Sequence, residues 1–480
     1  MSMIKKHSIL VLVSLFLSTS LFAQQEENIW TLDRCLNYAE ENNLNVKLQK
    51  LNVDRSKAML KQQKAGMAPD LSAYAQHDYN WGRTVDRFTN DFANTRILSQ
   101  NFYISSGVTL FNGFRMLNRL KERQLALEAT RMHVEKTVND IRLSVVTAYL
   151  QVLFNKELVE VNKNQLALTQ QQVEQTEKQV KAGALAKGAL LKVKSQLAQE
   201  KLNLVNAQNQ RDLAVLELKQ TLELPEDVPF QVPTPEVDLP ENIQINKSPR
   251  QVYEYAKDNQ PAIQGARLNV KSKEKALSAA RGAAYPNLQV QASYGTGYSG
   301  ASKELTDLSV TGFSPNGNIT QAGDTVLSPD VVYDNRVIPF KDQIDNNSNY
   351  SLGLSLSVPI FNGLQRRTQI QTSKIEVEQA KIQLKQEQNA VRKTIEQAHA
   401  DAKAALNRYY AAQQSKEASL LAFQDARQKF DVGMINAYEY NDAKNKLSQA
   451  ESDLLQAKFE YLFRKKVLDF YLDKPLIFDE

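Results

Sequence analysis

The chain has 480 residues, a formal net charge of +5 and a single cysteine. This small net charge argues against a protein that binds nucleic acid, or an acidic membrane surface, mainly through electrostatics. Cys35 has no second cysteine with which to form an internal disulfide. It is not a lipid-attachment site either, because Leu32-Asp33-Arg34 before it lacks the small residue that such a site needs.

Residues 1–23 are predicted to be a secretory signal peptide. Lys5 and Lys6 precede an apolar segment from Ile9 to Leu21, and the small residue Ala23 follows. The apolar segment is short for a membrane span, and no later stretch of about 18 apolar residues occurs. We therefore expect a protein that leaves the cytoplasm and is not held in the inner membrane by a helix.

The sequence repeats itself at a constant spacing. The segment Leu110-Phe111-Asn112-Gly113 returns as Ile360-Phe361-Asn362-Gly363, which lies 250 positions later. Gly183 returns as Gly433 at the same spacing. A repeat of this length indicates a duplicated half of one body and not a short solenoid module.

Upstream of these segments the spacing is smaller. Pro69-Asp70-Leu71 matches Pro286-Asn287-Leu288, which lies 217 positions later. The difference corresponds to one insertion of 33 residues between Leu288 and Ile360. We predict a first structural repeat over residues 24–224 and a second over residues 250–480, joined by a proline-rich linker at 225–249.

Long helices are predicted in both repeats. Their ranges are 37–66, 114–182 and 186–222 in the first, and 255–283, 364–432 and 436–472 in the second. No proline and no interior glycine occurs between Gly113 and Gly183, which allows a helix of roughly 100 Å. In each repeat the two shorter helices together are nearly as long as the long helix, so they could stack end to end along it. Gly183 and Gly433 suit the turns between the long helices and their partners.

The long helix of the first repeat has two heptad series. One is apolar, and the other is small or polar: Val145, Val152, Val159, Leu166, Val173 and Val180, beside Ala148, Asn155, Asn162, Thr169 and Thr176. A two-stranded coiled coil would have apolar residues in both series. A half-polar seam favours a wall of many helices, with one side touching neighbours and another facing water. An ordinary coiled-coil stalk remains the alternative.

Four segments alternate with period two and are predicted to be β-strands: residues 71–81, 102–110, 288–298 and 350–358. Each has about the ten residues that a tilted strand needs to cross a bilayer, with one apolar and one small polar face. A soluble sheet would need a covering amphipathic helix, and none is left over. Four strands cannot close a barrel, and an open edge cannot lie in lipid. We therefore predict twelve strands contributed by three copies.

The connections and strand ends carry further signals. The polar stretch 299–349 and its shorter counterpart 82–101 are predicted to be exterior loops. Aromatic residues gather at one strand end: Tyr79, Trp81, Phe102 and Tyr103. They indicate an interfacial belt, with a loose surface cluster as the alternative.

The duplicated halves, the strand end Val358-Pro359-Ile360-Phe361-Asn362-Gly363 and the helix break Phe430-Asp431-Val432-Gly433 resemble the TolC-like outer-membrane efflux proteins. The resemblance covers about residues 30–475. It implies a homotrimer with a twelve-stranded barrel in outer-membrane lipid and a twelve-helix tunnel across the periplasm. It implies a passive duct, docked by a periplasmic adaptor to an inner-membrane pump or secretion ATPase. The junctions between barrel and helices would be Phe111, Gly113, Pro359, Phe361 and Gly363.

The residues give little indication of catalysis. The four histidines are not paired at a metal-ligand spacing, and no glycine-rich phosphate loop follows a strand. No nucleophile motif occurs. We expect neither an enzyme nor a cofactor or metal site.

Glu439 and Asp442 form the candidate site. They are three positions apart, so they share one face of the helix that follows Gly433. In the family, acidic residues at these positions ring the constricted periplasmic mouth. Threefold symmetry would gather six carboxylates there, which would raise some of their pKa values and concentrate cations. The alternative is local, because Asn436 can cap this helix and Glu439 can complete a capping box.

The sequence departs from the family at this mouth. Relatives close it with a tyrosine three residues before the glycine and an arginine two residues after it, where this chain has Phe430 and Ile435. That latch cannot form as such. In the first repeat the matching acidic positions are Ala189 and Lys192. That tip is basic, which suits either adaptor docking or a solvated helix end: Lys178, Lys181, Lys187, Lys192 and Lys194.

Two other classes of protein fit the sequence less well. A periplasmic adaptor would have one helical hairpin flanked by β-rich domains, and a coiled-coil structural protein would leave the four strands unexplained. An outer-membrane duct accounts for both kinds of element.

Overall fold

The computed structural model describes residues 28–86, 89–90, 92–93, 96–234 and 247–476. The predicted signal peptide and residues 235–246 of the predicted linker lie outside these ranges. The chain divides into two compact units, one formed by residues 1–57, 125–271 and 378–480, the other by 58–124 and 272–377. The first unit is helical, and the second contains the strands together with the helix ends that adjoin them.

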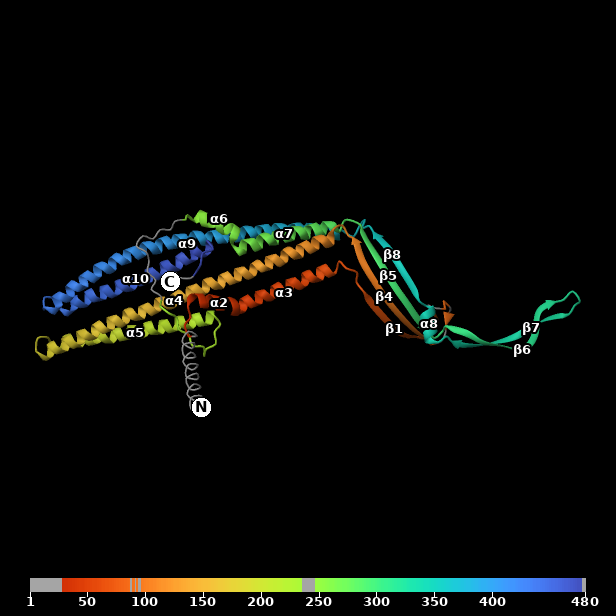
Figure 1. Cartoon of the computed structure of the whole chain (residues 1–480), viewed down its shortest axis with the longest axis horizontal. Helices are drawn as coiled ribbons and strands as arrows, with labels where there is room; N and C mark the ends of the chain where they lie inside the picture. The colour runs from red at the N-terminus through yellow and green to blue at the C-terminus, as the bar shows by residue number, and fades with distance from the viewer. Residues whose placement is uncertain (1–27, 87–88, 91, 94–95, 235–246, 477–480) are drawn as a thin grey trace, which may run out of the picture. The chain divides into compact units, whose positions relative to one another are not determined.

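Two long helical hairpins dominate the first unit (Figure 1). One is formed by α4 (Arg115–Lys181) and α5 (Lys187–Thr221), and the other by α9 (Gln365–Asp431) and α10 (Ala437–Tyr471). Within each hairpin the two helices lie side by side in all three ribbon views. Among the described residues, no helix combines the length and the apolar character required to cross a membrane.

The first short helix differs from the predicted range 37–66. It begins earlier, as α2 (Leu32–Asn42), where the Thr31 side chain accepts a hydrogen bond from Arg34 N. It then breaks, and α3 (Leu44–Ala65) follows. Asn43 causes the break, because its backbone is extended and its Oδ1 accepts from Asn45 N at 2.9 Å and Val46 N at 3.3 Å. Its side chain thus caps a new helix.

The predicted helix 255–283 is also two helices, α6 (Pro249–Asn259) and α7 (Pro261–Gly282). The break falls at Gln260, since the following Pro261 has no N–H and disfavours helical backbone in the residue before it. A capping box between Ser248 and Gln251 starts α6 inside the stretch predicted as linker.

End-to-end stacking of the short helices is visible in the first repeat. Glu223, just beyond α5, has a φ of 57°. Its carboxylate accepts hydrogen bonds from Leu44 N at 3.2 Å and from Asn43 Nδ2 at 3.1 Å. The end of α5 therefore holds the start of α3.

The largest apolar core of the helical unit lies between α2, α4, the end of α5 and the last part of α10. Its buried members include Cys35, Tyr149, Leu153, Leu218 and Leu462. Burial of these side chains supplies the free energy that holds the helices together, at about 1.5–3 kcal/mol for each large apolar side chain.

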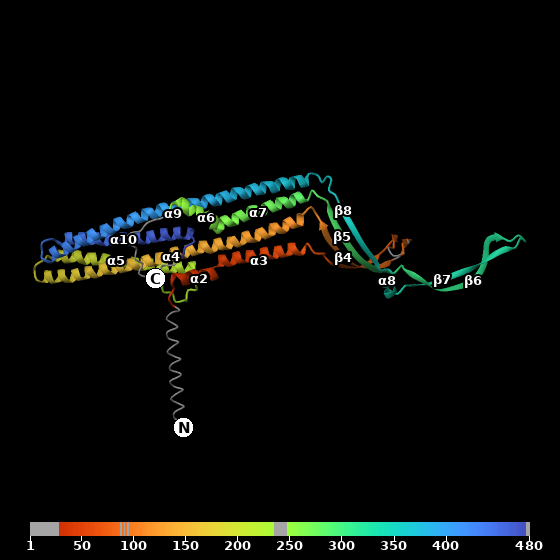
Figure 2. The same ribbon diagram turned by 45° about the horizontal axis from the view of Figure 1, so that its top comes forward.

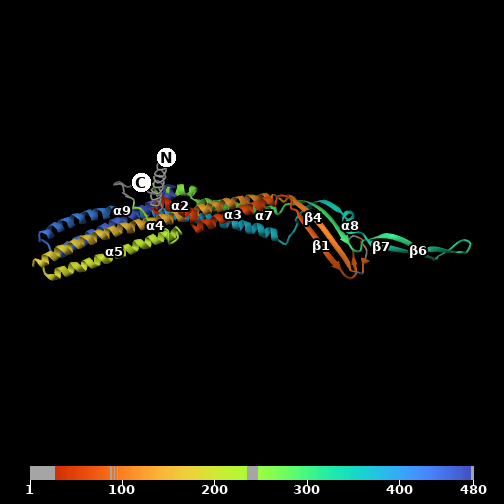
Figure 3. The same ribbon diagram turned by 60° about the horizontal axis from the view of Figure 1, so that its bottom comes forward.

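The second unit contains a four-stranded antiparallel sheet (Figure 1 and Figure 3). Its strands are β1 (Ser72–Asn80), β4 (Ile97–Phe111), β5 (Asn287–Ser299) and β8 (Asn349–Ser357), in the order β1-β4-β5-β8. No described strand pairs with the outer edge of β1 or of β8. One chain therefore leaves both edges open.

The duplication reappears in the strand register. Ser72 pairs with Ser105 in β1–β4, and Gln289 pairs with Ser355 in β5–β8. Gln289 lies 217 positions after Ser72, and Ser355 lies 250 positions after Ser105. These are the same two spacings that relate the two halves of the sequence. Each half therefore contributes the same two-stranded unit, and β4–β5 joins the halves.

The sheet has two chemically different faces. Val108, Val290 and Leu354 are direct neighbours across three strands on one face. On the other face, the Oγ atoms of Ser293 and Ser351 lie 2.5 Å apart. This division matches the alternation in the sequence.

The two connections predicted as exterior loops contain secondary structure. The stretch 299–349 contains β6 (Lys303–Ile319), β7 (Thr325–Val337) and α8 (Phe340–Asn346), and the stretch 82–101 contains β2 (Thr84–Val85) and β3 (Phe92–Ala93). In addition, β4 starts at Ile97 and not at residue 102, because it pairs with β1 as far as Asn80 and with β5 as far as Ser299. Bulges in β6 break its period-two pattern, which concealed that strand in the sequence.

Candidate functional site

Both hairpins turn through the same backbone motif. Gly183 and Gly433 have φ values of 74° and 76°, the left-handed region that favours glycine. Gly183 N donates to Val180 O at 3.1 Å and Ala184 N to Gln179 O at 2.9 Å, and the second turn has the equivalent pair of bonds. This is a Schellman motif, which satisfies the last carbonyl groups of α4 and α9.

Glu439 lies in the first turn of α10 and takes part in its cap. Asn436 Oδ1 accepts from Tyr438 N at 2.8 Å and from Glu439 N at 3.2 Å. Asn436 Nδ2 in turn donates to Glu439 Oε1 at 3.0 Å. The side chain of Glu439 thus has a local structural partner, and the residue is exposed.

Asp442 lies one turn further along the exposed face of α10. Its carboxylate forms an ion pair with Lys446 Nζ at 2.8 Å. The hydrogen bond to Asp442 raises the pKa of Lys446. Glu439 and Asp442 therefore share one exposed helix face, and Asp442 has a cation four residues away that partly compensates its charge.

Phe430, one of the two departures from the family pattern, is buried in the α9–α10 hairpin. Its ring stacks on Tyr440 with 4.8 Å between centroids, and Phe423 lies 5.6 Å from the same ring. Burial raises the pKa of Tyr440. Ile435, the other departure, packs at the margin of this apolar cluster.

Two contacts join the hairpins near their turns. Gln175 Nε2, on α4, donates to Asp431 Oδ1 at the end of α9 at 3.3 Å. Lys192 Nζ, on α5, lies 5.0 Å from the centre of the Tyr438 ring on α10. One of the basic residues of the first tip therefore contacts the second hairpin.

A buried lysine lies behind the exposed acidic face. Lys444 is 1% exposed, and its Nζ donates a hydrogen bond to Thr169 Oγ1 on α4. Desolvation lowers the pKa of Lys444 to about 8, and the nearby charge of Glu200 opposes that shift. Glu200, on α5, is itself 4% exposed. An amine and a carboxylate from different helices therefore share one buried region.

The neighbouring positions of α4 are also polar and buried. Thr169 and Thr176 are 0% and 1% exposed, which corrects the expectation that part of this seam faces water. Gln165, Gln172 and Thr176 each have a buried side-chain atom without a hydrogen-bond partner among the described residues. Close packing against the second hairpin covers these positions, and the heptad pattern alone did not reveal it. The spacing of Tyr440, Lys444 and Leu447 was the available signal, because it places the lysine on the apolar face of α10.

The predicted junctions between strands and helices lie in the second unit. Gly113 has a φ of 64°, and a Cβ placed there would overlap Gly282 O and lie 2.7 Å from Tyr285 Cβ. Gly363 has a φ of 59° and open space around it. The first junction is therefore packed against the end of α7, whereas a Cβ placed at Gly363 would meet no described atom within 4 Å.

The aromatic residues of the junctions show the same asymmetry. Phe111 is 37% exposed and packs edge to face on Phe114, whereas Phe361 is 79% exposed. Pro359 O accepts a hydrogen bond from Arg366 Nη1 at 3.2 Å.

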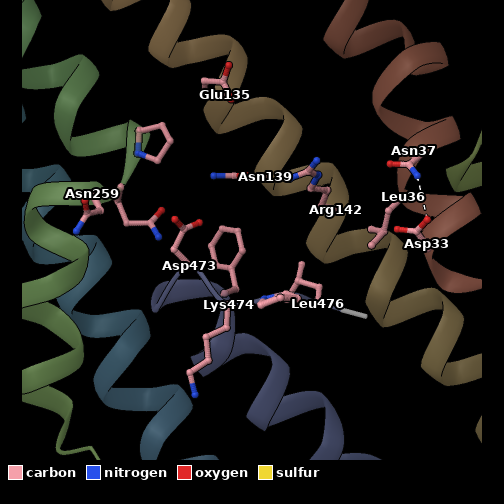
Figure 4. Close-up of a pocket in the computed structure, with 14 residues that line it drawn as sticks. Asp33, Leu36, Asn37, Glu135, Asn139, Arg142, Asn259, Asp473, Lys474 and Leu476 are labelled. Atoms are coloured by element: carbon pink, nitrogen blue, oxygen red, sulfur yellow. Dashed lines mark hydrogen bonds between the residues drawn. The ribbon is translucent and has the colours of Figure 1, made fainter. Parts of the chain in front are cut away.

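A cavity of about 580 Å³ lies in the helical unit between α2, α4, the α6–α7 break and the end of α10 (Figure 4). Its charged lining residues are Asp33, Glu135, Arg142, Asp473 and Lys474. Asp473 is the repeat counterpart of Glu223 and has the same φ of 57°. The position equivalent to Leu44 is Pro261, which has no N–H to donate. The cavity thus occurs where the capping contact of the first repeat cannot form.

Within the described ranges, no cluster of three or more His, Cys, Asp or Glu side chains has a geometry that could hold a metal ion.

Comparison with known proteins places the chain in a family. The sequence matches the outer membrane efflux protein family over residues 35–222 and 252–470. It is 23% identical over 463 residues to the outer membrane protein TolC of Escherichia coli strain K12, covering 95% of this chain and 84% of TolC.

Solved structures resemble the fold over nearly its whole length. CusC superposes with a TM-score of 0.72 at 16% identity, covering 93% of this chain and 92% of CusC. VceC of Vibrio cholerae superposes with a TM-score of 0.70 at 14% identity, covering 92% and 94% of the two chains. The chain belongs to the outer membrane efflux protein family, and it is an outer-membrane efflux channel protein.

Proposed function

We propose that three copies of this protein form a passive exit duct. It would carry substrates from an inner-membrane transporter across the periplasm and the outer membrane, with a periplasmic adaptor docking the two. The four-stranded sheet with two open edges supports this proposal most directly. Unpaired N–H and C=O groups at β1 and β8 are too costly in lipid, so the edges must pair with other copies.

The helical hairpins fit the periplasmic part of such a duct. The buried faces of α4 and α10 hold the two hairpins together, while Glu439 and Asp442 lie on an exposed face. In a trimer we propose that these two acids line the mouth and attract cations, with Asn436 and Lys446 as their local partners. A protein of this kind moves substrates without catalysing a reaction.

The experiment has three measurements, and the last is ion conductance in a planar bilayer. The protein is located by membrane fractionation, and the mass of the detergent-extracted particle is determined by light scattering. A trimer from the outer membrane that conducts ions in a planar bilayer is the expected result. A folded monomer in detergent would contradict the closed-barrel argument.

A further inference from the structure

The stretch 299–349, which contains the 33-residue insertion, includes a two-stranded ribbon that packs against no other described helix or strand. β6 and β7 pair with one another, and neither makes extended contact with any other helix or strand of the described chain. Figure 2 shows them continuing beyond α8 as a separate antiparallel pair. Such a pair is only marginally stable in water by itself.

The ribbon has one apolar and one polar face. The register puts these residues on the apolar face: Leu305, Leu308, Val310, Phe313, Pro315, Leu327, Pro329, Val331, Tyr333 and Val337. Lys303 and Asn335, near the root of the ribbon, are the polar exceptions on this face. The opposite face carries Glu304, Asp307, Ser309, Ser314, Ser328, Asp330, Asp334 and Arg336, with Val332 as its apolar exception. Both strands therefore direct their apolar side chains to the same side.

Two β-bulges maintain this division. The register shifts between Leu305 and Asp307 and again between Val310 and Gly312. The extra residues are threonines, and the hydroxyls of Thr306 and Thr311 donate to main-chain carbonyls of β7 at 2.9 Å and 3.2 Å. Without the shifts, simple alternation would move the apolar side chains of β6 from one face to the other.

The apolar face is uncovered in the single chain. Phe313 is 66% exposed, and Leu305, Val310 and Tyr333 are 53%, 51% and 59% exposed. A contiguous apolar surface of this kind indicates a contact with another molecule.

The root of the ribbon is fixed to the sheet. Gln343, on α8, is 1% exposed and donates to Ser299 O at 3.0 Å and Ile338 O at 2.8 Å. It also accepts from Ser299 N at 2.8 Å. These bonds tie the end of the ribbon to the end of β5, and Ile338 N also donates to Ser302 O at 3.0 Å, next to the start of the ribbon. The next strand in the chain is β8, an open edge of the sheet.

We propose that the apolar face of the ribbon packs against the ribbons of the other copies in the assembled channel. This inference rests on the proposed trimer. Because β8 must pair with another copy, each ribbon is rooted at a seam between copies, and its contact would continue that interface. Tethering at one rim also gives the three ribbons a high effective concentration.

Charge favours the same arrangement. The polar face has four carboxylates, from Glu304, Asp307, Asp330 and Asp334, against one cation, Arg336. Like charges repel polar faces from one another, so the apolar faces meet and the acids face water. An anionic lipid surface is a less favourable occupant for the same reason.

Single cysteines in the full-length protein test the contact. Val310→Cys lies on the apolar face, and Ser309→Cys is a matched control on the polar face. Cys35 can stay, because it is 0% exposed and burial raises its pKa to about 12. The purified detergent-solubilised protein is treated with a mild oxidant and, separately, with a bulky maleimide.

We expect at least about tenfold more disulfide-linked dimer from Val310→Cys than from Ser309→Cys, together with slower maleimide labelling. Light scattering on the same samples reports assembly independently. An intact trimer in which Val310→Cys and Ser309→Cys are labelled equally and neither forms a cross-link would overturn the proposed contact between ribbons. The proposed function would not be affected by that result. If Val310→Cys is protected from maleimide on whole cells but not in the purified protein, another component of the cell surface covers the apolar face. That result would also overturn the proposal. A monomeric particle would overturn both.

Discussion

The ring of Phe430 stacks on the ring of Tyr440, with 4.8 Å between their centroids, and joins the end of α9 to the first turns of α10. Both residues are less than 10% exposed. The family resemblance implied a polar latch at this position, and this chain has an apolar contact inside one hairpin instead.

Loss of the Phe430 ring should loosen the hairpin tip. Phe430→Ala creates a cavity beside Tyr440, and such changes cost about 3–5 kcal/mol. The measurement is hydrogen exchange of the α9–α10 tip in the detergent-solubilised protein. Met434→Ala is the control, because Met434 is 74% exposed in the same turn. Equal protection in the two variants would show that the stacked pair does not hold the tip.

The buried amine of Lys444 makes stability depend on pH in the alkaline range. Its folded-state pKa is about 8, below the ordinary value of 10.5. Below pH 8 the group is protonated in both states and its desolvation opposes folding fully. Between pH 8 and 10.5 the unfolded chain binds the extra proton, so this group's contribution to stability rises with pH, by about 3 kcal/mol at most.

Thermal unfolding followed by helical circular dichroism measures this dependence. The parent protein should gain stability relative to Lys444→Met as the pH is raised from 7 to 10.5. Lys465→Met is the matched control, because Lys465 is exposed on the same helix. Parallel curves for the parent and Lys444→Met would mean that Lys444 titrates normally.

The acidic face of α10 can be tested by cation block. If Glu439 and Asp442 line the mouth, a trivalent cation added on the periplasmic side of a planar bilayer should block conductance tightly. Block should weaken in Asp442→Ala and in the double variant. Unchanged block in the double variant would leave Glu439 as a capping residue, whose loss costs about 0.5–2 kcal/mol of stability.

The two faces of the sheet predict different responses to charge. Arginine at Leu354, on the apolar face, should cost about 2–4 kcal/mol near the middle of the bilayer, whereas arginine at Ser355 should cost less. The amount of assembled trimer in the outer membrane is the measurement. An equal loss in both variants would show that the face assignment is wrong.

The duplication predicts the register between copies. Within one chain Ser105 pairs with Ser293. The repeat counterpart of Ser105 is Ser355, which lies 250 positions later, and that of Ser293 is Gln76, which lies 217 positions earlier. We therefore expect Ser355 of β8 to lie opposite Gln76 of the next copy's β1. The double variant Ser355→Cys with Gln76→Cys should give disulfide-linked oligomers, and Ser355→Cys with Ala75→Cys should give far fewer. The reverse preference would indicate a slipped register.

The sequence by itself determined the elements whose periodicity is regular. Seven-residue spacing without proline or glycine predicted helices close to α4 and α9, and strict alternation predicted strands close to β5 and β8. The spacings between repeats also predicted two equivalent halves. These features depend on local backbone preferences and on which face must be buried.

Other features depend on contacts between distant segments, so only the tertiary structure decided them. Asn43 and Gln260 interrupt helices that look continuous, and Glu223 caps α3 from 179 residues away. The spacing from Tyr440 and Leu447 places Lys444 on the apolar face of α10, but only the hydrogen bond to Thr169 on α4 shows that another hairpin covers it. The ribbon was not predicted from the sequence because the bulges in β6 break the alternation of that strand. Only the pairing between β6 and β7 shows which side chains share a face.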